Sequence, residues 1–396
     1  MTTSPIRIAL IGLSANSGSA WAAGAHLPYL ISPRGKKHYT IVALLNSSPA
    51  AALAARDFFH LPASVKTYGD PEALAADPDI DLVVCITRVD IHFPTIAPSL
   101  RAGKPVYVEW PLTDNLPRAL ELERLSDKTA WESSILGLQG RVDPVVLKLA
   151  SLLREGRIGK VLSSDVRAWD AMLPRDQVPQ VVEYLSQRKV GGNRVTIAYA
   201  HFIDSVHSVL GEFDGFQARV QLRRPEIDVV DGFPTGNVVR KTATDVPDLV
   251  AVHGALKGKD YVADRATLTA AIRSGPPFKG DPAFVWSIHG EKGEMQFTIP
   301  TGPYLQVGHE KGQVSVKVHD FATDTVEDVE WDWQDWQKEL PLRARDVGEL
   351  YERYAAWVEG GKGKMEEGRE FTTVASGMAR MRETNEVLAQ FDQQQS

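Results

Sequence analysis

The chain has 396 residues, of which 44 are basic and 51 acidic, so its formal net charge is −7. Hydrophobic residues make up 43% and charged residues 24%, a globular composition that excludes a disordered or collagen-like chain. The single cysteine, Cys85, excludes an intramolecular disulfide framework and a cysteine-rich zinc site. This length favours two domains, each large enough to bury its own core.

The sequence also bears on location and partners. Its apolar runs are shorter than the ~20 residues that cross a bilayer, and the N-terminal MTTSPIRIALIGL has neither a basic leader nor a small-residue cleavage site. Together with the lone thiol, this favours a cytoplasmic location. The acidic balance, without a dense Lys/Arg stripe, argues against direct nucleic-acid binding. We expect small molecules or proteins as partners, and no membrane.

The first 134 residues alternate strands with helices. Their strands are continuous apolar runs, which favours a parallel sheet covered on both faces. We predict a dinucleotide-binding Rossmann domain over residues 1–134. Its strands are expected at Ile6–Ile11, Tyr39–Leu45, Ile80–Ile86 and Pro105–Val108, with helices through Leu30, over Ala50–Phe59 and up to Ala102.

The remainder, residues 135–396, begins with a strand-like run at Ile135–Leu138 and a helix at Asp143–Gly156, and then consists mostly of strands. Polar and apolar residues alternate over Gln313–Val318, which is typical of an antiparallel sheet with one wet face. We predict an α+β domain for substrate binding and oligomerisation. Its C-terminal helices, at Val347–Glu359 and Val374–Phe391, are candidates to pack back on the first domain.

The loop after the first strand has the features of a phosphate-binding turn. Backbone N–H groups at a helix N-terminus can hold a pyrophosphate, provided that side chains do not block it. Gly12 stands in the first glycine position, Ser14 replaces the second, and Ser17 or Gly18 replaces the third. The motif is irregular, but it follows the first strand of repeated strand–helix units, which is the context that dinucleotide binding requires.

The end of the second strand normally selects the cofactor, because a carboxylate there binds the ribose hydroxyls and repels a 2′-phosphate. This chain has Asn46, Ser47 and Ser48 instead. The missing acid favours NADP, with NAD as the alternative. An Asn-Ser turn that selects neither cofactor explains the same residues.

The segment Ser99–Leu112, which includes Ala-Gly-Lys and Glu109-Trp110-Pro111, resembles a signature of the Gfo/Idh/MocA oxidoreductases. Glu-Trp-Pro in place of that family's Glu-Lys-Pro resembles its fungal branch, represented by the galactose-regulon repressor. The likeness covers most of the chain. Other matching pieces follow in order: His26-Leu27-Pro28, Thr87, His92, Arg141, Gly191-Gly192, His201-Phe202-Ile203-Asp204 and Ile288-His289-Gly290-Glu291-Lys292-Gly293.

This resemblance implies a Rossmann domain, a second domain on a large open sheet, and a nicotinamide between them. Typical members oxidise or reduce a hydroxyl of a sugar or cyclitol. A lysine and an Asp-x-x-x-His pair surround the reacting carbon, and hydride passes to the nicotinamide. A homodimer through the open sheet is the expectation by analogy.

This chain departs from the family where the chemistry is expected. Trp110 occupies the lysine position, and Ile197 occupies the aspartate position four residues before His201. His201 is the candidate proton carrier or else a structural histidine, and Tyr199 is a candidate substitute acid or else a core residue. Glu109 is placed near the nicotinamide or at a structural strand end. Trp110 either stacks on a ligand or fills the core.

The candidate site residues form three sets, and no His/Asp/Glu cluster has convincing metal spacing. The resembled family has its substrate near the segment that here runs from Trp169 to Lys189, so this segment is a candidate for polar contacts with substrate. An exposed connecting segment would have the same composition. The catalytic candidates are His201, Tyr199 and Glu109; those for the cofactor are Gly12, Ser14, Ser17, Asn46, Ser47, Ser48, Thr87, His92, Glu109 and Trp110; those for substrate are Trp110, Arg141, Trp169, Tyr184, His201 and Asp204.

Two functions follow. The first is an NAD(P)-dependent oxidoreductase of a small hydroxylated or carbonyl substrate, in which His201 and Tyr199 replace the lost lysine. The second is a catalytically silent, dinucleotide-sensing transcriptional regulator that binds a protein partner and works in the nucleus. We favour the enzyme, because most of the resembled family is catalytic and a titratable histidine is retained. The substrate is not assigned by these residues.

Overall fold

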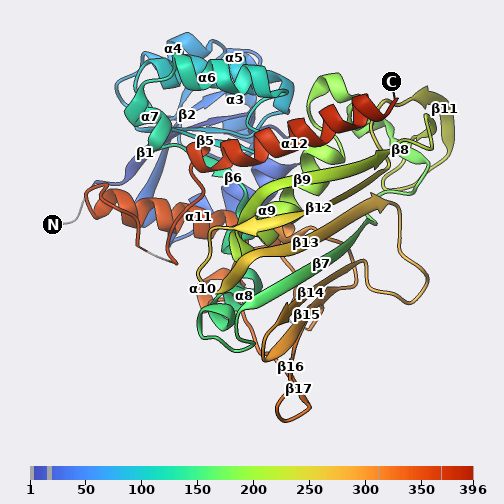
Figure 1. The fold of residues 1–396 in the computed structure, drawn as a ribbon. Helices are drawn as coiled ribbons and strands as arrows, with labels where there is room; N and C mark the ends of the chain where they lie inside the picture. Colours follow the sequence, from blue (N-terminus) through green and yellow to red (C-terminus); the bar gives the residue numbers. More distant parts are fainter. Residues whose placement is uncertain (1–3, 16–19, 311, 367, 396) are drawn as a thin grey trace. The chain divides into compact units, whose positions relative to one another are not determined.

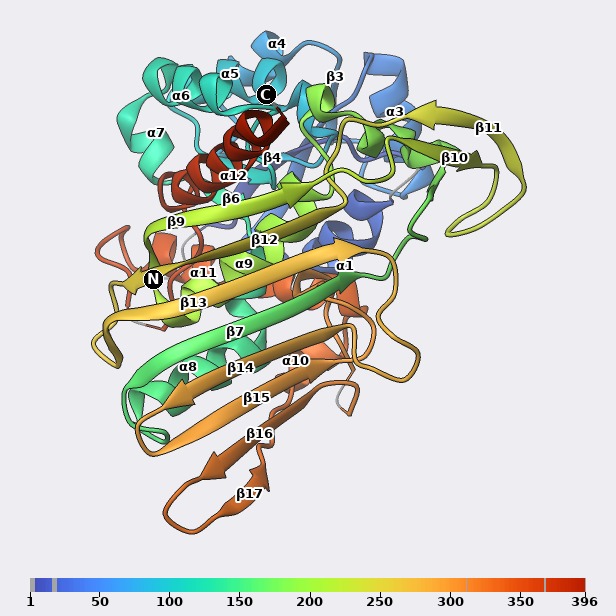
Figure 2. The same ribbon diagram turned by 45° about the vertical axis from the view of Figure 1, so that its right-hand side comes forward.

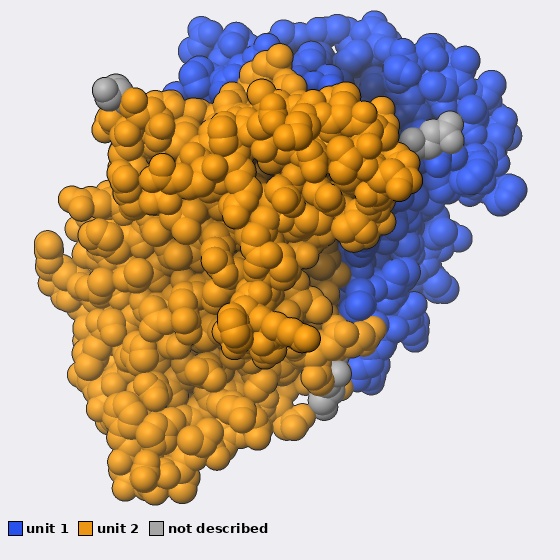
Figure 3. Space-filling model, turned by 90° about the vertical axis from the view of Figure 1, so that its right-hand side faces the viewer, with its two compact units in different colours: residues 1–142, 334–382 blue, residues 143–333, 383–396 orange. Residues whose placement is uncertain are grey.

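The structure is a computed structural model that describes residues 4–15, 20–310, 312–366 and 368–395. The chain divides into two compact units (Figure 3). Unit 1 comprises residues 1–142 and 334–382, and unit 2 comprises residues 143–333 and 383–396. No helix in the described part of the chain is long and apolar enough to cross a membrane.

Unit 1 is built on a parallel sheet of six strands in the order β3-β2-β1-β4-β5-β6. This is the strand order of a Rossmann fold, and it places all the carboxyl ends of the strands at one edge. The expected fold is therefore confirmed. The blue to teal strands and helices of this unit are seen at the upper left of Figure 1. The strands are β1 (Ile6–Ile11), β2 (Tyr39–Leu45), β3 (Lys66–Tyr68), β4 (Leu82–Cys85), β5 (Val106–Glu109) and β6 (Ile135–Gly137).

Helices cover both faces of this sheet. Several begin with a polar cap followed by proline: the Ser48 hydroxyl accepts the Ala51 N–H at 3.1 Å and Asn115 accepts the Arg118 N–H at 2.9 Å, which satisfies N–H groups that the first turn leaves open. The helices are α1 (Leu27–Ile31), α2 (Gly35–His38), α3 (Pro49–Phe58), α4 (Pro71–Ala75), α5 (His92–Arg101), α6 (Leu116–Leu125), α7 (Lys128–Glu132), α10 (Asp335–Lys338), α11 (Leu342–Glu359) and the first part of α12 (Val374–Gln395).

The unit boundaries differ from the predicted division at residues 134 and 135. Strand β6 continues the parallel sheet, because Tyr107 of β5 pairs with Ile135. Helix α11 also belongs to unit 1, where its buried Leu350 and Tyr351 share a core with Leu10 of β1. The C-terminal helices were expected as candidates to pack back on the first domain, and the structure groups α11 and the first part of α12 with unit 1.

Unit 2 contains an eight-stranded sheet in the order β17-β16-β15-β14-β7-β13-β12-β9 (Figure 2). Every neighbouring pair is antiparallel except β13 with β7. This confirms the mostly antiparallel sheet. The strands are β7 (Val161–Asp170), β9 (Glu212–Gln221), β12 (Leu249–Lys257), β13 (Val262–Ser274), β14 (Phe284–Gly290), β15 (Gly293–Ile299), β16 (Ser315–Asp320) and β17 (Thr325–Asp328).

One face of this sheet carries helices α8 (Pro144–Arg154) and α9 (Ala200–Leu210), seen behind it in Figure 2. Their side chains share one core with the strands, including the buried Leu149, Phe202 and Trp286. On β16, Val316 and Val318 are buried while Lys317 is exposed, so the predicted alternation is confirmed.

A small second sheet in unit 2, β11-β10-β8, was not expected from the sequence. Its strands are β8 (Gln177–Pro179), β10 (Glu226–Val230) and β11 (Val238–Ala243). Short 3₁₀ or π-helical turns complete the two units: Ala22–His26, Val89–Ile91, Gln139–Val142, Gln180–Ser186, Arg188–Val190, Val195–Tyr199 and Leu305–Val307.

Two tryptophans that follow β17 are buried in the core of unit 2, next to a buried histidine. Trp331 and Trp333 are 7% and 3% exposed, and the Trp333 indole N–H donates to the His309 carbonyl at 2.8 Å. The His309 ring is itself 5% exposed, and burial lowers its pKa to about 4. The folded unit therefore holds this ring neutral.

We expect His309 to make unit 2 acid-sensitive. As the pH falls below the ordinary histidine pKa of about 6.5, His309 binds a proton in the unfolded chain but stays neutral in the folded unit. The free energy of unfolding is therefore at its full value above that pH and decreases towards pH 4. Between pH 7 and pH 5 the free energy of unfolding of the wild type should fall by on the order of 1–2 kcal/mol more than that of His309→Gln, measured by urea denaturation. The exposed His253→Gln should behave as wild type; equal slopes for His309→Gln and wild type would contradict this role.

Candidate functional site

Four predicted cofactor residues stand at the carboxyl ends of neighbouring strands in unit 1. Gly12, Asn46 and Thr87 follow β1, β2 and β4, and Glu109 ends β5. Successive strands are added on one side of β1 up to β3 and on its other side from β4 onwards, so the strand order reverses between β1 and β4, where open α/β sheets bind their ligands. Gly12 and Thr87 thus flank the expected ligand crevice.

The backbone at Gly12 admits no side chain. Its φ is +94°, and a Cβ there would lie 2.6 Å from the Thr87 Cγ2 and 2.8 Å from the Ile86 carbonyl oxygen. The Gly12 N–H donates to the Leu45 carbonyl at 3.1 Å, which ties the turn to β2. Ser14 follows in a partly buried position, whereas Ser17 lies outside the described residues.

The turn after β2 uses two of its three polar residues to hold itself together. The Asn46 amide donates to the carbonyls of Leu13 and Ala51 at 2.9 and 3.3 Å, and Ser48 caps α3. Ser47 is exposed. Asn46 therefore joins this turn to the Gly12 loop, and the preference for NADP over NAD stays a prediction.

His92 links the loops that follow β4 and β5. Its Nδ1 lies 2.9 Å from the Pro111 carbonyl oxygen and its Nε2 lies 2.9 Å from that of Thr87. The ring is 1% exposed, and burial lowers its pKa. Since both nitrogens face backbone oxygens, His92 positions Thr87, and a direct contact with cofactor stays a prediction.

Glu109 is the centre of a buried polar network within unit 1. The Gln139 amide donates to both of its carboxylate oxygens at 2.9 Å, and the His26 Nε2 lies 2.9 Å from Oε1. The other nitrogen of His26 lies 2.9 Å from the Tyr351 hydroxyl of α11. Glu109 and the adjacent Trp110 are 8% and 6% exposed. These contacts are those of a residue with a structural role at the end of β5. A catalytic role of Glu109 stays a prediction.

The predicted substrate residues are divided between the units. Trp110 and Arg141 belong to unit 1, whereas Trp169, Tyr184, His201 and Asp204 belong to unit 2. His201 and Asp204 lie on α9 and are 8% and 1% exposed. The ring of Trp169 has the Arg273 guanidinium 5.7 Å from its centre.

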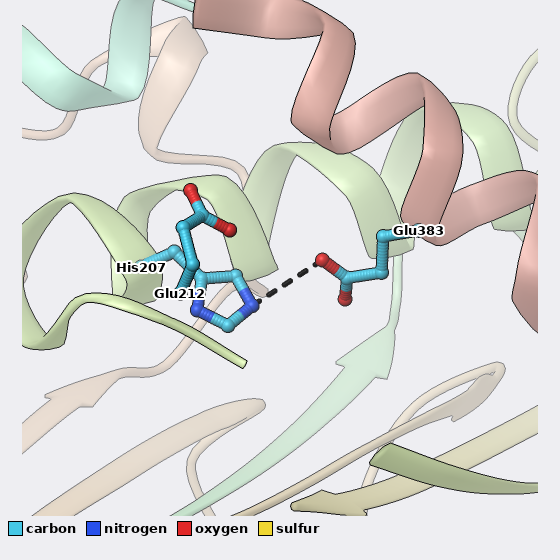
Figure 4. Close-up of side chains that lie close together, drawn as sticks. All are labelled: His207, Glu212 and Glu383. Atoms are coloured by element: carbon cyan, nitrogen blue, oxygen red, sulfur yellow. Dashed lines mark ion pairs between the residues drawn. The ribbon is translucent and has the colours of Figure 1, made fainter. Parts of the chain in front are cut away.

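Tyr199, the candidate substitute acid, is fully buried, and its hydroxyl donates to the Glu383 Oε1 at 2.5 Å. The other oxygen of Glu383 lies 3.3 Å from the His207 Nε2, and the His207 Nδ1 donates to the Gly211 carbonyl at 2.7 Å. Figure 4 shows His207 and Glu383 facing each other, with the carboxylate of Glu212 turned aside.

The potential ligand atoms of His207, Glu212 and Glu383 lie within 4.8 Å of one another. Sequence spacing did not reveal this cluster, because Glu383 comes from the C-terminal helix. The expectation that the protein holds no metal stays a prediction.

Unit 2 contains a cavity of about 200 Å³. Ile197, which stands in the aspartate position of the resembled family, lines it. At one end, the Asp170 carboxylate accepts hydrogen bonds from the Arg194 guanidinium and the Tyr304 hydroxyl. The sequence indicated this region through the segment from Trp169 to Lys189 and through Ile197, whereas Tyr304 and Asp248 come from parts of the chain that it did not single out.

Comparisons with known proteins identify relatives of both units. The model of the oxidoreductase family with an NAD-binding Rossmann fold matches residues 6–131, and that of the Gal80p C-terminal domain matches residues 144–298. Dehydrogenase aclE of Aspergillus oryzae is 31% identical over 296 residues, 75% of this chain and 77% of that protein. The galactose/lactose metabolism regulatory protein GAL80 of Kluyveromyces lactis is 26% identical over 75% of this chain and 65% of its own length.

Solved structures support the fold. A super-repressor mutant of Gal80p from Saccharomyces cerevisiae has a TM-score of 0.84 at 20% identity, over 98% of this chain and 96% of that chain. Levoglucosan dehydrogenase in complex with NADH and L-sorbose has a TM-score of 0.69 at 15% identity, over 99% of this chain and 98% of that chain.

The Gly12 turn can be tested by adding one methyl group. Gly12→Ala should lower the free energy of unfolding by about 2 kcal/mol, because Cβ meets Thr87 and Ile86 in a backbone conformation that disfavours side chains. Thermal unfolding of the full chain measures this. Gly24→Ala is the matched control, since nothing lies within 4 Å of its Cβ. A Gly12→Ala protein as stable as Gly24→Ala would contradict the described turn.

Proposed function

We propose that this chain, which belongs to the Gfo/Idh/MocA family of oxidoreductases and has a Gal80-type second domain, is an NAD(P)-dependent oxidoreductase of small hydroxylated or carbonyl compounds. The observation that carries the proposal is the bare backbone turn at Gly12, at the switch between β1 and β4. The 31% sequence identity with a dehydrogenase, over 75% of this chain, supports the proposal.

The residues at this edge fit a dinucleotide. Gly12 lets the backbone after β1 approach Thr87 and Ile86, which a Cβ would strike, and the next described helical segment in the chain begins at Ala22. A close backbone turn that precedes a helix is the arrangement in which phosphate binds. Thr87 would lie beside the phosphates or ribose, and Ser47 offers an exposed hydroxyl near the second ribose. When bound, the nicotinamide supplies or accepts the hydride.

The proton of the substrate hydroxyl is assigned to His201. Trp110 cannot supply the positive charge that a lysine would place near a carbonyl. Of the lysine, aspartate and histidine that surround the reacting carbon in the resembled family, this chain retains the histidine, His201. Tyr199 is less suited to this task, because its hydroxyl donates to Glu383 inside the core of unit 2.

A regulator is the second candidate. Residues 144–298 match a domain of Gal80p, and Trp110 and Ile197 replace the lysine and aspartate of catalytic members. In that case the dinucleotide would be sensed without turnover, and its binding would change the affinity for a protein partner. The titratable His201 favours the enzyme.

The test combines cofactor binding with turnover. NADPH and NADH are titrated into the full chain by tryptophan fluorescence. Turnover is then followed at the absorbance of the reduced nicotinamide, as its loss from NADPH or NADH with aldoses and ketones and as its gain from NADP⁺ or NAD⁺ with polyols. We expect binding and turnover, with kcat reduced on the order of 100-fold in His201→Ala and cofactor Kd unchanged. The exposed His253→Ala is the control.

Unchanged turnover in His201→Ala would remove His201 from the mechanism. Cofactor binding without turnover across the whole panel would contradict the enzyme and favour the regulator.

A further inference from the structure

The cavity of unit 2 has mostly apolar walls. Cavities on the order of 150 Å³ with such walls hold a benzene ring, so a volume of about 200 Å³ accommodates a ring with a short substituent. The walls come from the segment after β7, from β8 and β10, from the helical turns Gln180–Ser186 and Val195–Tyr199, and from residues beside other strands. The apolar lining residues are Met172, Leu173, Val178, Leu185, Ile197, Ala198, Ile227, Val246 and Val307.

One donor in this lining has no acceptor. Asn193 is 1% exposed, and its Oδ1 accepts the backbone N–H groups of Val195 and Thr196 at 3.0 and 3.2 Å, which fixes the orientation of the amide. The Nδ2 is buried and has no hydrogen-bond partner among the described residues. A buried donor without an acceptor costs about 1–3 kcal/mol, and an oxygen of a bound molecule would remove this cost.

The neighbouring charges also favour an oxygen acceptor. Asp170 is 5% exposed and already accepts from Arg194 and Tyr304; burial, together with Asp170, raises the pKa of the Tyr304 phenol well above its usual value, so it remains a donor. Asp248 accepts the backbone N–H groups of Arg223 and Arg224 at 2.8 and 2.9 Å.

Cations exceed anions in this lining. Three arginines and two aspartates line the cavity, so a neutral or negative oxygen is preferred over an ammonium group. The arginines are Arg175, Arg194 and Arg224, and the aspartates are Asp170 and Asp248.

Ile197 makes the lining of this cavity different from that of a sugar-binding site. Its position is the one in which the resembled family has an aspartate, whose carboxylate could bind substrate hydroxyls. An isoleucine offers no hydrogen bond, and a polyol placed against these walls would leave several hydroxyl groups unpaired at a cost for each.

We infer that the cavity binds a small molecule with an apolar, ring-sized body and one carbonyl or carboxylate oxygen, held at the end formed by Asn193 and Arg194. The identification of this molecule as the substrate rests on the proposed function, whereas the binding itself does not. The cavity selects a carbonyl compound of low polarity over a sugar or polyol.

The test titrates three probes into the full chain without cofactor, by calorimetry: acetophenone for an apolar ketone, benzoate for a carboxylate, and sorbitol for a polyol. We expect acetophenone or benzoate to bind at least about tenfold more tightly than sorbitol, and which of the two binds more tightly identifies the oxygen. Sorbitol binding as tightly as both aromatic probes, or no binding of either aromatic probe at millimolar concentration, would overturn the inference.

Asn193→Asp assigns the binding to this cavity. A carboxylate retains the two backbone hydrogen bonds of Asn193 but replaces its free donor by an acceptor, so we expect the tighter aromatic probe to bind about tenfold or more weakly. Asn115→Asp, the same change at a capping residue of unit 1, should leave binding unchanged. Unchanged binding in Asn193→Asp would overturn the inference.

Ile197→Asp supplies the test should Asn193→Asp fail to fold. It should weaken the aromatic probes and improve sorbitol relative to them; the wild-type order of affinities would overturn the inference. Addition of NADPH to acetophenone, and of NADP⁺ to sorbitol, then separates the two proposals. Acetophenone binding that depends on Asn193, without oxidation of NADPH, supports the cavity and contradicts the enzyme. Turnover of sorbitol with NADP⁺ and none of acetophenone with NADPH supports the enzyme and contradicts the cavity.

Discussion

The close approach of the Gly12 backbone to Thr87 and Ile86 is the constraint on which the dinucleotide edge of unit 1 depends. It brings the turn after β1 within van der Waals distance of the chain after β4, at the switch point of the parallel sheet. The neighbouring turns are arranged around it, since Asn46 holds the Leu13 carbonyl and His92 holds that of Thr87. Asn46 and His92 thus use their polar side chains to position the backbone of these turns. The backbone, rather than these two side chains, is then available to contact a ligand.

Each unit also encloses a buried carboxylate that orders its surroundings. Glu109 is held by Gln139 and His26 in unit 1, and Asp170 by Arg194 and Tyr304 in unit 2. A carboxylate so engaged is costly to remove, because its partners would remain buried without it. The second network lies in the wall of the unit 2 cavity, whose lining also contains the buried Asn193 amide, with no hydrogen-bond partner for its Nδ2 among the described residues.

Much of the fold follows from local patterns. Continuous apolar strands followed by capped helices predict the parallel sheet, and alternation over Gln313–Val318 predicts the wet-faced antiparallel one. The contacts that hold α11 in unit 1 do not follow from such patterns, because they join residues more than 300 positions apart, such as Tyr39 and Tyr351, whose ring centres lie 5.1 Å from each other. The cavity was indicated only in part, by Ile197 and the segment from Trp169 to Lys189. Gly191-Gly192 precedes Asn193, but nothing local indicates that Asn193 lines the same cavity as Tyr304 and Asp248.

Transfer of hydride between cofactor and a small carbonyl compound is the central claim, and isotope transfer tests it most directly. The full chain is incubated with NADPH in which deuterium replaces both hydrogens on C4 of the nicotinamide, together with an apolar ketone that its cavity binds. The alcohol formed is analysed by mass spectrometry. We expect an alcohol that carries one deuterium on the former carbonyl carbon. Binding of both molecules with no labelled alcohol would contradict the claim.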